Sequence, residues 1–143
     1  MKKLVSILSV CFLLISCSKA NLKPLTVQTS NGDITYFVEV ADTNQTLQKG
    51  LMNRKSLKAD SGMIFVFNSS HPQPIAMWMK NTYISLDMLF LDSKGYIIAL
   101  VENTKPMSER LIRPTLKPSS YVVELNAGEI KKHDIKIGDK VLF

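Results

Sequence analysis

Residues 25–40 read LTVQTSNGDITYFVEV, and this stretch decides the fold class of the chain. Two runs rich in β-branched and aromatic residues, 25–29 and 34–40, flank the turn sequence SNGD. An Asn-Gly pair between two such runs is the strongest short-range signal for a β-hairpin, because both residues accept the positive φ angles of a tight turn. The sequence therefore predicts a domain that opens with a β-hairpin.

The same strand signals recur toward the C-terminus, separated by segments rich in proline and small polar residues. A helix is expected from Asp42 or Thr43 to about Arg54, and a helical turn at 127–133. Loops are expected at 68–74 and, over a long irregular connection, at 103–119. The further strands are expected at 62–67, 75–80, 86–92, 96–102, 121–125 and 140–143.

This order of elements predicts a mainly β fold, because nearly all of its members are short strands. We expect a compact β-sandwich or barrel of about seven short strands with one or two short helices. Residues 25–143 are sufficient for a single core, so we expect a single β-rich domain.

The N-terminus has the order of a bacterial lipoprotein signal. Two lysines precede an apolar run from Leu4 to Ile15, which is shorter than the roughly 20 residues that span a bilayer. Leu14-Ile15-Ser16-Cys17 resembles a lipobox, with a small residue just before the cysteine. We therefore expect residues 1–16 to be a signal peptide, Cys17 to carry the lipid anchor and residues 17–24 to form a tether.

A lipid on Cys17 would place the domain in the bacterial cell envelope, facing the periplasm or the exterior. Ser18 is not the aspartate that retains some lipoproteins at the inner membrane, which favours the outer membrane. Cys17 is the only cysteine left after processing, so we expect no disulfide, cysteine metal site or other cofactor. Processing lowers the formal charge from +6 to +4 through loss of Lys2 and Lys3, and the remaining basic residues are scattered. This argues against a nucleic-acid partner.

Two carboxylates stand out because each lies inside an apolar run. Asp87 and Glu124 would each need a cation or several hydrogen-bond donors if buried, and Lys80 or Arg54 is the expected partner of Asp87. One interpretation is that the two acids have a structural role and hold loops in place through hydrogen bonds and ion pairs. The alternative is a hydrolase-type enzyme that uses both acids, with Lys80 or Arg54 stabilising charge.

Residues around Trp78 suggest a contact surface. On a strand Trp78, Lys80 and Thr82 would share one face, with Met77, Met79 and Asn81 on the other. Aromatic and amide groups beside the 103–119 connection suit a small ligand, glycan or peptide of the envelope. A less favoured alternative is a soft-metal site for Cu(I), built from Trp78, His71, Met63, Met77, Met79, Met88 and Met107.

The ordered motifs Gly50–Arg54, Gly62–Phe65, Met77–Thr82, Leu86–Phe90 and Glu124–Gly128 resemble the family called Domain of Unknown Function 192. The resemblance covers almost all of 25–143 and implies a compact β fold, an exported or lipid-anchored protein and no established activity. Asn53 departs from the aromatic or apolar residue usual in the family. The residues matching the motif are Arg54, Gly62, Met63, Trp78, Lys80, Asn81, Thr82, Asp87, Glu124 and Gly128. Of these we take as candidate binding residues Arg54, Trp78, Lys80, Asn81, Thr82, Asp87 and Glu124.

Overall fold

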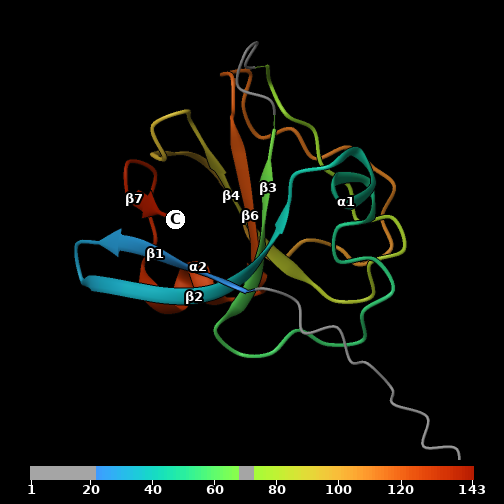
Figure 1. The fold of residues 1–143 in the computed structure, drawn as a ribbon, viewed down its shortest axis with the longest axis horizontal. Helices are drawn as coiled ribbons and strands as arrows, with labels where there is room; N and C mark the ends of the chain where they lie inside the picture. Colours follow the sequence, from blue (N-terminus) through green and yellow to red (C-terminus); the bar gives the residue numbers. More distant parts are fainter. Residues whose placement is uncertain (1–21, 68–72) are drawn as a thin grey trace, which may run out of the picture.

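The protein folds into a mainly β, nearly closed barrel-like sheet with two short helices (Figure 1). A computed structural model describes residues 22–67 and 73–143. The two helices are α1 (Asn44–Lys49) and α2 (Glu129–His133). The seven strands are β1 (Lys23–Thr29), β2 (Gly32–Ala41), β3 (Ser61–Val66), β4 (Leu86–Leu91), β5 (Ile97–Val101), β6 (Tyr121–Asn126) and β7 (Lys140–Leu142).

The predicted hairpin is confirmed in β1 and β2. The two strands pair antiparallel from Thr29↔Gly32 to Lys23↔Val38, and Gly32 has the positive φ of 120° that the turn requires. β1 begins at Lys23, so it takes in the last two residues of the expected tether. Pro24 is tolerated there because β7 pairs with β1 only over residues 26–28.

The sheet runs in the order β5-β4-β6-β3-β2-β1-β7, and its two ends approach each other. All neighbours are antiparallel except β2 and β3, which are parallel and are connected through α1. Three backbone hydrogen bonds join the end strands. Ile97 donates to the carbonyl of Asp139 at 2.9 Å, Gly138 to that of Ile97 at 2.8 Å, and Val141 to that of Gly95 at 2.9 Å. These bonds almost close the barrel.

The central strands are buried on both faces. One apolar cluster fills the barrel interior and draws on all seven strands and on α2; its members include Leu25, Tyr36, Leu89, Leu125 and Val141. A second cluster lies on the outer face of β3, β4 and β6, with Met63, Phe65, Met88 and Val122 among its members. Figure 1 shows α1 beside β3, on the side away from β7.

Two predicted elements differ from the structure. The first helix ends at Lys49 instead of about Arg54, because Gly50 adopts a φ of 45° and its N–H closes the last turn on Thr46. Its start is as expected, since Thr43 caps it. No strand forms at 75–80: within the described residues this segment makes a single bridge, Met77↔Ile112, to the irregular 103–119 connection.

The remaining strand predictions agree with the structure to within one or two residues, and the 103–119 connection is irregular as expected. Residues 68–72 of the predicted loop lie outside the described residues, as do the signal peptide and Cys17. No helix among the residues that the structure describes has the length and apolar character needed to cross a bilayer.

Candidate functional site

Strand register separates the two buried acids. On β4 and β6 the paired residues are Met88↔Glu124 and Asp87↔Leu125. Because directly paired side chains share a face and neighbours along a strand do not, Asp87 lies on the interior face and Glu124 on the outer face. The two acids therefore cannot act on one substrate, and the hydrolase arrangement that combines them is wrong.

Asp87 is fully buried and is held by backbone amides instead of a cation. Its Oδ1 accepts the N–H of Asn103, and its Oδ2 accepts those of Gly128 and Ile130, each at 2.9 Å. The expected pairing with Lys80 or Arg54 is wrong, because three donors already satisfy the carboxylate. Asp87 fastens the connection after β5 and the start of α2 to the barrel.

Arg54 lies at a different surface. It forms a two-bonded ion pair with Glu39, at 2.5 and 2.8 Å, beside a separate hollow of about 550 Å³ that also includes Leu57 and Lys58. The hydrogen bonds from the guanidinium hold the pKa of Glu39 below its usual value. The structure therefore does not bring Arg54 to the other candidate residues.

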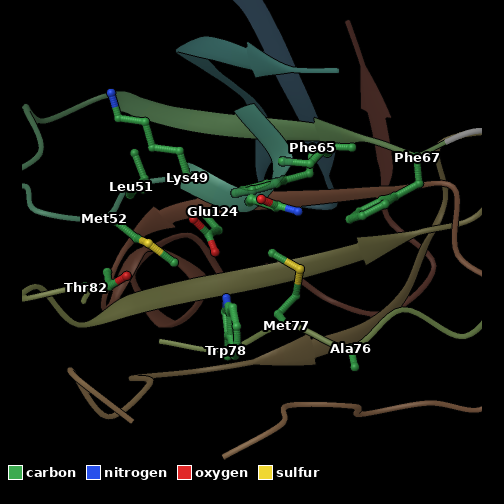
Figure 2. Close-up of a pocket in the computed structure, with 13 residues that line it drawn as sticks. Lys49, Leu51, Met52, Phe65, Phe67, Ala76, Met77, Trp78, Thr82 and Glu124 are labelled. Carbon is green, nitrogen blue, oxygen red and sulfur yellow. The ribbon is translucent and has the colours of Figure 1, made fainter. Parts of the chain in front are cut away.

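Glu124 opens into a pocket of about 100 Å³ on the outer face of the sheet (Figure 2). The end of α1 and the turn after it form one wall, β3 and Phe67 a second, and the segment around Trp78 a third. The lining residues are Leu47, Gln48, Lys49, Gly50, Leu51, Met52, Phe65, Phe67, Ala76, Met77, Trp78, Thr82 and Glu124. Most of these residues have aromatic, aliphatic or thioether side chains.

The carboxyl group of Glu124 is the polar centre of this pocket. Glu124 is only 4% exposed, and burial raises the pKa of its side chain to about 8. Among the described residues no side chain or backbone group donates a hydrogen bond to it. Figure 2 shows the carboxyl group directed into the pocket, with the indole nitrogen of Trp78 turned toward it.

Lys80, Asn81 and Thr82 shape the wall that carries Trp78. The Lys80 amine lies 5.4 Å from the centre of the Trp78 ring and 3.7 Å from Glu109. Asn81, with a φ of 52°, accepts the N–H of Asn53 and so ties this wall to the turn after α1. Thr82 is buried, and its hydroxyl donates to the carbonyl of Lys80. Trp78, Thr82 and Glu124 thus meet at one pocket, and Lys80 lies beside the Trp78 ring.

The methionines proposed for Cu(I) are not assembled into a separate site in the part of the chain that the structure describes. Met63, Met79 and Met88 are buried in the outer-face cluster, and Met107 is half exposed on the 103–119 connection. Only Met77 of that set lines the pocket. His71 lies outside the described residues, within which no three His, Cys, Asp or Glu side chains group to hold a metal ion.

Several pocket residues were not anticipated from the sequence. Phe65 and Phe67 stack with ring centres 6.5 Å apart, and Met52 faces them from the turn after α1. Two glycines of the motif allow the walls to approach. A Cβ on Gly50 would lie 3.0 Å from the Phe65 ring, and one on Gly62 would lie 2.5 Å from the Glu124 carbonyl oxygen. Gly50 and Gly62 were the sequence features from which this close approach of the walls could have been predicted.

Comparison with family models identifies one family for this chain. The family model described as DUF192, Uncharacterized ACR, matches residues 26–143. A protein of unknown function from Novosphingobium aromaticivorans is 34% identical, with a TM-score of 0.80 and 85% of each chain covered. A protein from Sinorhizobium meliloti, described as a proposed transcription regulator, is 38% identical, with a TM-score of 0.78, and the match covers 85% of this chain and 92% of that one. No curated protein is significantly similar. On the extent of the family match and these identities, the chain belongs to the DUF192 family.

Proposed function

We propose that this chain is a lipid-anchored module of the bacterial cell envelope that binds a small ligand, or one side group of a glycan or peptide, in the Glu124 pocket. The observation that carries the proposal is the pocket itself. It is concave, most of its lining residues are apolar, and it has one carboxyl group at its base and an exposed tryptophan at its mouth. Binding sites for small molecules have this composition.

The volume of the pocket limits the size of the ligand. Drug-sized ligands occupy clefts of roughly 300–1,000 Å³, whereas a cavity of about 150 Å³ accepts benzene. A pocket of about 100 Å³ therefore suits a single short chain or small ring. A larger partner would insert one group here and make its other contacts around Trp78, which is 42% exposed.

Binding is supported over catalysis by what surrounds Glu124. Of the described residues that line the pocket, Lys49 is the only other one with an ionisable side chain. Figure 2 shows its side chain running away from the carboxyl group. General acid–base hydrolysis relies on a second positioned group, which this lining does not supply.

The envelope location is supported by the sequence around Cys17. The described domain starts at Leu22, so few residues separate it from the proposed anchor. Several acyl chains make such anchoring durable. A lipid on Cys17 would therefore hold the pocket close to a membrane surface, and Ser18 favours the outer membrane.

The anchor is tested by Cys17→Ser, since a hydroxyl cannot carry the thioether-linked lipid. We expect the wild-type protein to partition into detergent and to carry acyl mass, and the variant to lose both. Equal partitioning of the two proteins, with no acyl mass on the wild type, would contradict the envelope proposal.

Ligand binding is tested with Trp78, which is the only tryptophan of the chain and lines the pocket. The full chain in detergent would be titrated with small amines, alcohols, carboxylates, sugars and short peptides while its emission is recorded. We expect at least one class to shift the emission, and Met77→Phe, which changes a side chain that Figure 2 shows extending into the pocket, to weaken the shift. No shift with any compound, or an unchanged shift in Met77→Phe, would contradict a ligand site at this pocket.

A further inference from the structure

We infer that the Glu124 pocket selects ligands that carry an alkylammonium group, which it takes as an ion pair with the Glu124 carboxylate, and that binding releases the Glu124 proton. This inference rests on the proposed ligand-binding function. It adds the chemical class of the ligand and the protonation change that accompanies binding.

The first support is the geometry around the carboxyl group. Glu124 is 4% exposed, and Figure 2 shows it directed into the pocket between the Phe65 side and the Trp78 side. A buried carboxylate is stable only with a cation or several donors beside it. A ligand that carries three N–H donors on a positive centre supplies both requirements.

The second support is the aromatic wall. The stacked rings of Phe65 and Phe67 and the indole of Trp78 line the same space. Aromatic faces attract ammonium groups through their quadrupole, and they attract them more strongly when the site is shielded from water. The Lys80 amine already lies 5.4 Å from the centre of the Trp78 ring. The same indole therefore tolerates an ammonium group as a neighbour.

The third support is the charge of the elements packed around Glu124. From β3 and β4 the facing side chains are apolar, including Phe65 and Met88, and Asp87 lies on the opposite face. From α1 the charged group is Lys49, which extends away from the carboxyl group, and from the Trp78 segment it is Lys80, which lies beside the Trp78 ring and is not among the residues that line the pocket. Within the described residues the cation that would balance Glu124 is therefore left for a ligand to supply.

The protonation change follows from burial. With the pKa of Glu124 raised to about 8, the empty pocket holds a neutral carboxylic acid at pH 7. An incoming R–NH₃⁺ pairs with the carboxylate, and the carboxyl proton leaves to solvent, so charge and protons balance. Affinity should then rise about tenfold per pH unit below pH 8 and level off above it. It should fall again where the amine itself loses its proton, near pH 10.

The test uses three probes of similar size on the full chain in detergent: n-butylamine, n-butanol and butyrate. Binding is followed by Trp78 emission between pH 6 and pH 9, and by calorimetry at pH 7 in phosphate and in Tris. We expect butylammonium to bind at least tenfold more tightly than butanol, and butyrate to bind least. The binding enthalpies measured in the two buffers should differ by nearly the full difference between the ionisation enthalpies of phosphate and Tris, because nearly one proton is released to the buffer.

Matched variants separate Glu124 from general effects of charge. Glu124→Gln should remove both the pH dependence and the preference for the amine, whereas Glu102→Gln, an exposed control, should keep both. If Glu124→Gln does not fold, the pH dependence of binding by the wild-type protein still tests the inference. A second arm, Nα-acetyl-lysine methylamide, distinguishes a peptide side chain from a free amine by which of the two binds more tightly.

The outcomes distinguish this inference from the function it rests on. If n-butanol binds as tightly as n-butylamine, or if the amine binds with no proton release, the ammonium inference is wrong and ligand binding by the pocket stands. If butylammonium gives no response while another class of compound does, the same conclusion follows. If no compound of any class gives a response, both the inference and the proposed function are wrong.

Discussion

Asp87→Asn would replace a buried acceptor of three backbone N–H groups by an amide that can accept on one side only. Whichever way the new side chain turns, its NH₂ group faces the N–H of Asn103 or those of Gly128 and Ile130. At least one donor is then left buried without a partner. The remaining bonds also lose the negative charge of their acceptor.

The size of the loss follows from these bonds. A hydrogen bond to a charged group contributes about 1.5–3 kcal/mol, and charge-assisted bonds are roughly twice as strong as neutral ones. One lost bond and two weakened bonds give an expected destabilisation of about 4 kcal/mol. Since domains of this kind are stable by only about 5–15 kcal/mol, the variant should be close to unfolding.

Urea denaturation of wild type and Asp87→Asn measures this loss. The matched control is Asp92→Asn, at the end of the same strand, where the carboxylate accepts the N–H groups of Lys94 and Tyr96 in an exposed turn. The control should lose about 1 kcal/mol or less, because water can replace the carboxylate there. Hydrogen exchange should show early loss of protection at Ile130.

A double-mutant cycle with Lys80→Met tests the reasoning further. Lys80 pairs with Glu109 and shares no partner with Asp87, so the two changes should be additive within about 0.5 kcal/mol. A coupling well above about 1 kcal/mol would mean that an ion pair holds Asp87. That result, or a loss from Asp87→Asn no larger than in the control, would refute the role assigned to the three amides.

Three further outcomes follow from the structure. Because the pKa of Glu124 rises on folding from 4.5 to about 8, the folded state binds the extra proton, and stability should fall by up to about 5 kcal/mol as the pH rises from 4.5 to 8; denaturation of Glu124→Gln should not show this fall. Gly62→Ala should cost about 3 kcal/mol in thermal unfolding, since its Cβ would meet backbone 2.5 Å away; wild-type stability in this variant would contradict the close approach. Arg54→Met should cost about 1 kcal/mol at pH 7, and because folding lowers the pKa of Glu39, that difference should vanish as the pH falls through this lowered pKa and Glu39 is protonated; a constant difference in acid would rule out the ion pair as its cause.

Most of the strands could be predicted because their signals are local. The turn sequence at 30–33 and the β-rich runs around it need no knowledge of distant residues. The end of α1 was missed because a glycine inside a helix costs only about 1 kcal/mol, which does not by itself reveal a stop. The 75–80 segment has a strand composition, yet what lies beside it is the irregular 103–119 connection. Composition does not show which partner a segment will find.

The candidate site was only partly predictable for a related reason. Glu124 was recognisable as a carboxylate inside an apolar run and Trp78 as part of a contact surface, and both line the pocket. The separation of Asp87 from Glu124 depends on the register between β4 and β6, which sequence patterns do not contain. All six residues of β4 are buried, so the alternation that normally reveals the two faces of a strand is absent. Phe65 and Phe67 resemble ordinary core residues until the sheet is assembled.

The place of β7 beside β1 has a consequence for how the chain folds. β1 finds one neighbour at once in β2, but its other neighbour is made by the last residues of the chain. Until Val141 is available the barrel interior lacks one of its apolar side chains, and β1 keeps an open edge that other chains can pair with. A chain cut short before β7 should therefore persist as an aggregation-prone intermediate. Only chains that include β7 can close the barrel.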